Sequence, residues 1–329
     1  MVISGLDKNG YGKGEVISQT RDQVSYDLEV HRTVDEDLKV PLLSLNGEKL
    51  EFADLIGEDF ELSKQNVKFN FDPLYDSDGR IKLDIESEDK WIKERQIVLN
   101  LTYSDKNFSK SELVSWIDKK IRFKILDKAD KSTFIRDRLD DLLSSVSLTV
   151  LSINRFYLAD RLKTLISELL INVAREKFQI YFESEKISIR RFGKFPDKVI
   201  LSEKIPENYK KNYYSGVEPL NGEEKSFVNR LDSESLTNIQ FWLRNRERKD
   251  PFYLQGWRPN RFYPDFIAVS KTKKFIAIEW KGLDRVNDED TKYKQELAKK
   301  WEELGKGDLY FFLATNENVD EVLNKISKL

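Results

Sequence analysis

Two apolar runs, residues 266–269 and 275–280, stand five polar residues apart in the sequence. Apolar runs of this length joined by so short a polar segment indicate a β-hairpin. If residues 270–274 form the loop, Asp265 and Glu279 stand opposite each other at the far end of the hairpin. The alternative is a surface hairpin with scattered charges, since the pattern Glu-x-Lys occurs four times in this chain.

Two directly opposed carboxylates need a compensating charge. Opposed residues of an antiparallel pair have Cβ atoms ~4.5–5.5 Å apart, so like charges there are destabilising. The two-residue period of a strand also places Lys281 on the face of Glu279 and turns Trp280 to the other side. Oxygen ligands without imidazole or thiolate suit Mg²⁺ or Mn²⁺. The sequence therefore predicts a divalent-cation site at Asp265 and Glu279, with an ammonium group beside it.

Composition restricts the chemistry to carboxylates, lysines, tyrosines and serines. The 329 residues include no Cys and a single His, His31. Zinc hydrolases, His-dependent nucleases and Ser-His-Asp triads need imidazole, and disulfides need thiols. No apolar run approaches the ~18 residues of a membrane span, and the first residues lack the pattern of a signal peptide. We therefore expect a cytoplasmic protein without a membrane partner.

The charge of the chain is balanced overall but positive near the predicted site. Lys and Arg number 56 against 58 Asp and Glu, which excludes a basic nucleic-acid coat protein. Residues 244–281, however, contain ten basic and four acidic residues. Such a field suits a phosphate backbone, although a solvated helix end and hairpin tip would have the same composition. The basic residues that flank the motif are the expected nucleic-acid contacts: Arg258, Arg261 and Lys294. Three tryptophans are more typical of a core than of base stacking: Trp242, Trp257 and Trp301.

Patterning predicts an α+β multi-domain protein with four segments. Residues 1–105 are predicted to be a β-rich domain, an antiparallel sheet or small barrel. Residues 106–182 are predicted to be a helical connector, and residues 183–220 a hairpin and linker. Residues 221–329 alternate helix and strand, which indicates an α/β domain with a mixed sheet.

Periodicity and capping signals locate the expected elements. Alternating apolar residues predict strands in the first segment over residues 24–30, 67–71, 81–85 and 97–103. A capping box at Ser109 to Glu112 begins the first connector helix, and two more are predicted over residues 134–143 and from about 154 to 173. In the last segment we predict a helix over 223–231 that continues or restarts through residues 239–242, and helices over 290–304 and 319–329. Strands are predicted over 252–254, 266–269, 275–280 and 309–313.

The last segment resembles the PD-(D/E)xK nuclease superfamily, with Pro264-Asp265 and Glu279-Trp280-Lys281 as its core motif. More narrowly, residues 221–313 are similar to the C-terminal endonuclease region of type III restriction subunits and related helicase-nuclease proteins. The narrower similarity lies in Glu224-Lys225-Ser226-Phe227, Leu231-Asp232, Trp242, Asn245, Phe252, Tyr263-Pro264-Asp265-Phe266, Ile278-Glu279-Trp280-Lys281-Gly282, Lys294 and Trp301.

This resemblance implies a restriction-endonuclease-like fold and metal-dependent hydrolysis of DNA. Asp265 and Glu279 would hold Mg²⁺ or Mn²⁺, the Trp280 carbonyl would add a ligand, and Lys281 would serve the attacking water. Glu224 matches the upstream acidic residue that completes the site. From its position alone, Glu224 is equally a solvated carboxylate in the first turn of a helix.

One expected part of such a protein is missing from the sequence. Relatives of this kind carry an ATPase motor, yet no G-x-x-x-x-G-K-[ST] phosphate loop occurs here. The expected helicase motor therefore belongs to another chain or to a missing N-terminal part, in a restriction or anti-phage defence system. The alternative is a catalytically idle nuclease-fold subunit that binds nucleic acid or acts as a scaffold. No residue excludes an RNA-directed nuclease or a nickase.

Overall fold

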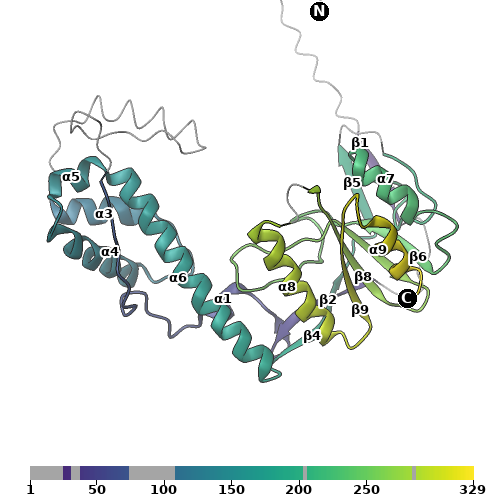
Figure 1. The fold of residues 1–329 in the computed structure, drawn as a ribbon, viewed down its shortest axis with the longest axis horizontal. Helices are drawn as coiled ribbons and strands as arrows, with labels where there is room; N and C mark the ends of the chain where they lie inside the picture. The colour runs from purple at the N-terminus through teal and green to yellow at the C-terminus, as the bar shows by residue number, and fades with distance from the viewer. Residues whose placement is uncertain (1–24, 31–37, 74–107, 203–205, 284–286) are drawn as a thin grey trace, which may run out of the picture. The chain divides into compact units, whose positions relative to one another are not determined.

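The computed structural model describes residues 25–30, 38–73, 108–202, 206–283 and 287–329. The chain forms two compact units (Figure 1). Unit 1 consists of Met1–Leu43, Ser188–Leu254 and Phe262–Leu329, and unit 2 of Ser44–Ile187 and Gln255–Arg261. The strands predicted over residues 81–85 and 97–103 lie outside the described residues. The division into four segments stays a prediction.

Unit 2 is mainly helical. It contains α1 (Phe52–Ile56), α3 (Lys110–Lys120), α4 (Lys128–Leu143), α5 (Leu148–Ile153) and α6 (Arg155–Glu183). The long helix α6 contacts α1, α3 and α5, and its buried stripe includes Leu158, Leu162, Ile166 and Leu170. These helices confirm the helical pattern predicted for the connector. In the part of the chain that the structure describes, no helix is both long and apolar enough to cross a membrane.

Side chains fix where α3 and α4 begin. The predicted capping box is confirmed, because the Glu112 carboxylate accepts a 2.8 Å hydrogen bond from the Ser109 N–H while Ser109 Oγ accepts from the Glu112 N–H at 3.3 Å. At α4, the Asp127 carboxylate accepts from the N–H groups of Ala129 and Asp130, at 2.8 and 2.9 Å. Both helix starts therefore follow from local hydrogen bonding.

Unit 1 contains a four-stranded mixed sheet. Its strand order is β6 (Ile239–Arg244), β7 (Phe266–Ser270), β8 (Phe275–Trp280) and β9 (Leu309–Ala314). The first two pairings are antiparallel, and β8 pairs with β9 in parallel. Helix α8 (Glu289–Leu304) makes the crossover that a parallel pair requires. The predicted mixed sheet and the predicted β7–β8 hairpin are confirmed.

Helices cover both faces of this sheet (Figure 1). Helices α7 (Gly222–Leu231) and α9 (Val319–Ile326) share a core with Phe266 and Ile278. On the opposite face, Trp301 of α8 packs edge-on against Phe275, with ring centroids 6.1 Å apart. The four-stranded sheet is therefore packed between α7 and α9 on one face and α8 on the other.

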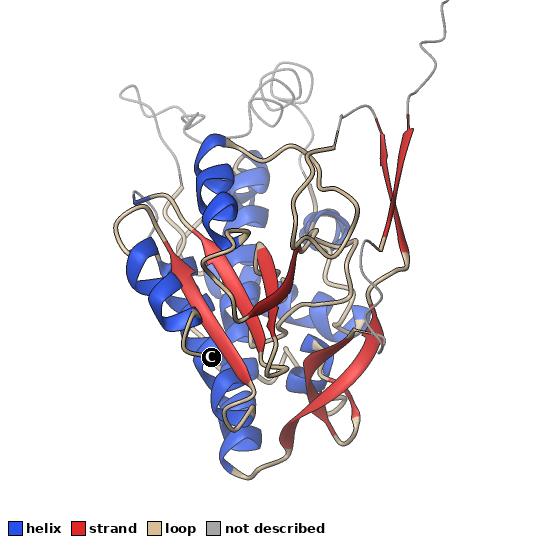
Figure 2. Ribbon diagram, turned by 90° about the vertical axis from the view of Figure 1, so that its right-hand side faces the viewer, coloured by secondary structure: helices blue, strands red, loops and turns tan. Residues whose placement is uncertain are grey.

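Two further strand pairings in unit 1 correct the sequence prediction. Strand β1 (Ser25–Glu29) pairs with β5 (Lys198–Ser202) as a separate two-stranded ribbon (Figure 2), and β2 (Lys39–Leu45) lies beside β4 (Ile187–Lys194). The hairpin predicted after residue 183 is wrong, since β4 and β5 have partners from early in the chain. Between β4 and β5, the buried Phe195 donates its N–H to the Leu38 carbonyl at 3.3 Å. The two strands belong to different sheets.

Three other predicted elements are also wrong. Residues 239–242 form a strand, not a helix, and a bulge between Ile239 and Phe241 breaks the alternation that marks a strand. Residues 67–71 form no strand, although they alternate in burial. Residues 252–254 form only an isolated bridge between Leu254 and Phe262. In each case the apolar pattern indicated burial correctly, but burial alone does not determine the hydrogen-bonded partner.

Candidate active site

Asp265 is held by main-chain hydrogen bonds just before β7. The Asn245 N–H donates to the Asp265 carbonyl at 2.8 Å. The amide of Asn245, which is buried, donates to the carbonyls of Pro264 at 2.9 Å and Phe252 at 3.1 Å. From the neighbouring strand, the Trp280 N–H donates to Asp265 Oδ2 at 2.8 Å. Asn245 therefore fixes the backbone of this segment, and the Trp280 N–H fixes the Asp265 carboxylate.

Asp265 and Glu279 lie at the same end of the hairpin. The β7–β8 register pairs Ile267 with Ala277, so the next positions on that face of the sheet are Asp265 and Glu279. This is the face that α8 covers. The register predicted from the five-residue loop is confirmed for the paired residues of β7 and β8.

Glu279 is buried and has two lysine partners. Its side chain leaves 4% of its surface exposed, and its Oε1 lies 3.2 Å from Lys281 Nζ and 3.1 Å from Lys294 Nζ. Lys294 also pairs with Asp290 at 3.0 Å. The other oxygen, Glu279 Oε2, is buried without a hydrogen-bond partner. Buried polar atoms rarely lack a partner, so this oxygen is a candidate ligand position.

The electrostatics of the cluster raise two pKa values. Burial, followed by the charge of Glu279, raises the pKa of Asp265 to about 7, while the Trp280 N–H and Lys281 oppose the rise. Although burial lowers the pKa of Lys294, the charges of Glu279 and Asp290 outweigh it and raise that pKa. Perturbed carboxyl groups of this kind mark candidate functional sites.

Glu224 is a buried capping residue, not the solvated carboxylate that its position alone indicated. At the start of α7, its Oε2 accepts from the Asn221 N–H at 3.1 Å, which completes a capping box. Its Oε1 accepts from Arg244 Nη2 at 3.3 Å. The charge of Glu224 nevertheless raises the pKa of Asp265, so it acts electrostatically on the carboxylate cluster. Sequence analysis did not identify Arg244 as its partner, because no local signal links residues on separate elements.

Of the predicted nucleic-acid contacts, Lys294 lies in the carboxylate cluster, with its Nζ 3.1 Å from Glu279 Oε1. Arg261 belongs to unit 2, where its Nη2 lies 2.6 Å from Glu51 Oε1. Arg258 also belongs to unit 2, and its carbonyl accepts from the Gln255 amide at 2.9 Å. The three tryptophans predicted for the core are buried as expected: Trp242, Trp257 and Trp301.

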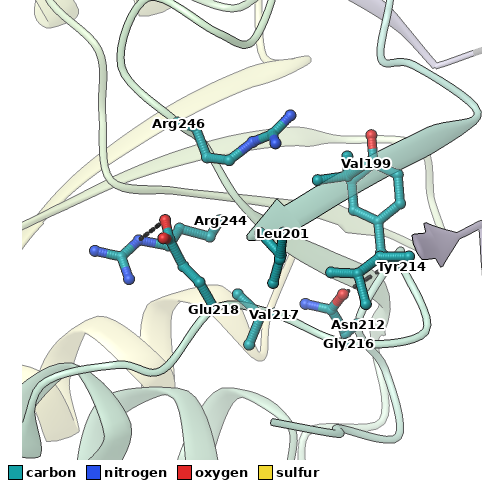
Figure 3. Close-up of a pocket in the computed structure, with 10 residues that line it drawn as sticks. Val199, Leu201, Asn212, Tyr214, Gly216, Val217, Glu218, Arg244 and Arg246 are labelled. Atoms are coloured by element: carbon teal, nitrogen blue, oxygen red, sulfur yellow. Dashed lines mark hydrogen bonds and ion pairs between the residues drawn. The ribbon is translucent and has the colours of Figure 1, made fainter. Parts of the chain in front are cut away.

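A small cavity lies elsewhere in unit 1, beside Arg244 (Figure 3). Its volume of about 20 Å³ is enough for one or two water molecules rather than a substrate. Apolar side chains such as Val199 and Leu201 line it, and Glu218 Oε1 lies 4.0 Å from Arg244 Nε at its edge. Neither Asp265 nor Glu279 lines this cavity, so it is distinct from the carboxylate pair.

The candidate ligands are a pair of carboxylates rather than a larger cluster. Across the described ranges, no group of three or more His, Cys, Asp or Glu side chains is placed to hold a metal ion. The orphaned Glu279 Oε2 and the partly buried Asp265 carboxylate are oxygen donors of the kind that a hard divalent cation takes. Comparison of this chain with protein-family models, with curated proteins and with solved structures gives no match.

Proposed function

We propose that this protein is a metal-dependent endonuclease that hydrolyses phosphodiester bonds in DNA. The observation that carries the proposal is a pair of carboxylates on one face of the sheet, the partly buried Asp265 and the buried Glu279, with Lys281 and Lys294 on Glu279 Oε1. A divalent cation would supply polarisation of the phosphodiester and neutralisation of negative charge.

Each residue of the cluster has a distinct task in this proposal. Asp265 and Glu279 would hold Mg²⁺ or Mn²⁺, and the Trp280 carbonyl and Glu224 are the further candidate ligands. Because the pKa of Asp265 is raised to about 7, a bound cation would favour its ionised form near neutral pH. Lys281 orients the attacking water and stabilises the negative charge that develops on the phosphate.

The proposed biological setting is a restriction or anti-phage defence system in the cytoplasm. The chain carries no phosphate-loop sequence, so DNA translocation would depend on an ATPase of the helicase class. We place this motor in another chain or in an N-terminal part of a longer protein. DNA is the proposed substrate, and no membrane partner is proposed.

A second candidate is a catalytically idle nuclease-fold subunit that binds nucleic acid or acts as a scaffold. The observation that favours it is the neutralisation of Glu279 by two ammonium groups at 3.1 and 3.2 Å. Such an ion-paired network is self-sufficient without a cation. Metal-dependent cleavage separates the two candidates.

The test is cleavage by the full chain of supercoiled, linear and single-stranded DNA, and of RNA, with Mg²⁺, Mn²⁺ or EDTA. We expect cleavage of DNA with either cation and none in EDTA. Asp265→Asn and Lys281→Ala should each reduce the rate by at least about 10²-fold, as removal of a charge-stabilising group commonly does.

Two surface variants provide matched controls. Glu317→Gln and Lys328→Ala remove the same charges at exposed positions of unit 1. They should cleave as the unchanged protein does. Cleavage that persists in EDTA, or that survives in both site variants, would remove the proposal. Cleavage of RNA alone would replace the substrate but keep the site.

A further inference from the structure

Unit 2 carries a dense group of basic residues between two of its helices. Residues 119–128 span the end of α3, the connecting loop and the first residue of α4, and they contain five basic residues and one acidic residue. The acidic residue, Asp127, caps α4 with its carboxylate. We call the five exposed basic residues the basic cluster: Lys119, Lys120, Arg122, Lys124 and Lys128.

Carboxylates do not neutralise the basic cluster in the part of the chain that the structure describes. Lys120 lies over the ring of Phe156, 5.5 Å from its centroid, and the other four members make no ion pair there. The nearby acidic residues have other partners. Asp118 pairs with Lys131 at 3.2 Å, and Asp130 accepts the N–H groups of residues 62 and 63.

Helix stability accounts for only part of the basic cluster. Lys119 and Lys120 lie in the last turn of α3, where cations interact favourably with the helix dipole. Lys128 instead opens α4, at the positive end of the dipole, where a cation is unfavourable. Arg122 and Lys124 belong to neither helix. Like charges this close also repel one another. Arg122, Lys124 and Lys128 therefore lower the stability of the folded unit unless a polyanion binds them.

We propose that the basic cluster binds the phosphate backbone of double-helical nucleic acid, as a contact in unit 2 separate from the candidate active site. A duplex carries one negative charge per ~1.7 Å of its axis, which suits several cations on one short segment. An acidic membrane is the less suitable partner. Membrane-binding segments present a fully exposed apolar face beside their cations, whereas here Ile121 is buried and Phe123, Ile125 and Leu126 are partly buried.

The test is binding of a labelled 20-base-pair duplex in EDTA, measured by fluorescence anisotropy over a series of KCl concentrations. The cluster variant combines Arg122→Ala, Lys124→Ala and Lys128→Ala. The matched control combines Arg161→Ala, Lys163→Ala and Lys68→Ala, which removes one Arg and two Lys from exposed positions of the same unit. Circular dichroism and thermal unfolding establish that both variants fold.

The salt dependence gives the expected result. Each phosphate contact contributes ~0.9 to the slope of log K against log [salt], so losing three lowers the slope by about 2.7. Between 50 and 200 mM KCl, the affinity of the unchanged protein should therefore fall about 40-fold further than that of the cluster variant. The control should keep the full slope.

Three outcomes would overturn this inference. They are no binding of the duplex by the unchanged protein at 50 mM KCl, equal slopes for the cluster variant and the control, or a larger loss of binding to phosphatidylserine vesicles than to the duplex. Because EDTA prevents metal-dependent cleavage, the result does not depend on nuclease activity. A failure of the proposed catalytic function therefore remains distinguishable, since this assay measures binding alone.

Discussion

The backbone N–H of Trp280 donates a 2.8 Å hydrogen bond to Oδ2 of Asp265. The antiparallel ladder of β7 and β8 ends at Phe266 and Ile278. Beyond it, the Asp265 carboxylate accepts the Trp280 N–H in place of a backbone carbonyl. The bond opposes the rise in the pKa of Asp265, but burial and the charge of Glu279 outweigh it. Folding therefore places an ionisable group where its charged form is disfavoured.

The pH dependence of stability follows from this pKa. Below the ordinary value of 3.8, Asp265 is protonated in both folded and unfolded chains. Between about pH 4 and pH 7 only the unfolded chain ionises, so the free energy of unfolding falls as pH rises through this window. Asp265→Asn removes this effect. It should raise the free energy of unfolding by ~2 kcal/mol more at pH 8 than at pH 5, in EDTA. Urea unfolding measures this, and an equal change at both pH values would contradict it.

Lys294→Ala should show how much the second lysine stabilises the buried Glu279 carboxylate. Lys281 alone would then neutralise a carboxylate that is buried, which should lower the free energy of unfolding by ~1–3 kcal/mol in EDTA. Mg²⁺ should recover part of this loss if the site binds a cation. Thermal unfolding with EDTA and with Mg²⁺ measures both effects. Lys299→Ala, at an exposed position of the same helix, is the control, and equal behaviour of the two variants would refute the prediction.

Two substitutions separate the roles of Glu224. Glutamine can retain the hydrogen bond of the capping box but not the charge, whereas alanine removes both. Glu224→Gln should therefore stay within ~0.5 kcal/mol of the unchanged stability and cleave DNA at least about tenfold more slowly. Glu224→Ala should lose ~1 kcal/mol in addition. Urea unfolding and the cleavage assay give the two readings, and full activity of Glu224→Gln would limit Glu224 to capping.

Trp301→Phe should destabilise unit 1. The Trp301 Nε1 donates a buried 2.9 Å hydrogen bond to the Pro41 carbonyl. Phenylalanine keeps most of the ring packing but leaves this carbonyl without its donor, which costs ~1–3 kcal/mol. Denaturant unfolding with an unchanged m-value would show it. Trp116→Phe in unit 2 is the control, and a loss equal to that control would contradict the prediction.

Sequence patterns predicted the elements whose signals are local. The short polar loop and the period of two fixed the register of β7 and β8, because one loop length allows few pairings. The capping box at Ser109 located the start of α3 for the same reason. Asp265, Glu279 and Lys281 could be placed together because they belong to one hairpin and its extension.

The elements that sequence analysis missed depend on distant partners. A bulge after Ile239 hid the strand period of β6, and β4 and β5 pair with strands from the start of the chain. Lys294 also lies 3.1 Å from Glu279 Oε1. Nothing in the sequence near Lys294 specifies that pairing. Tertiary packing decides it.

The hydrogen bond between Trp301 and Pro41 also implies an order in which the two units fold during synthesis. The two residues are 260 positions apart, and both belong to unit 1. Since a ribosome delivers the chain from its N-terminus, Pro41 emerges long before its partner. Unit 1 therefore stays incomplete until translation has passed α8, whereas most of unit 2 has already left the ribosome.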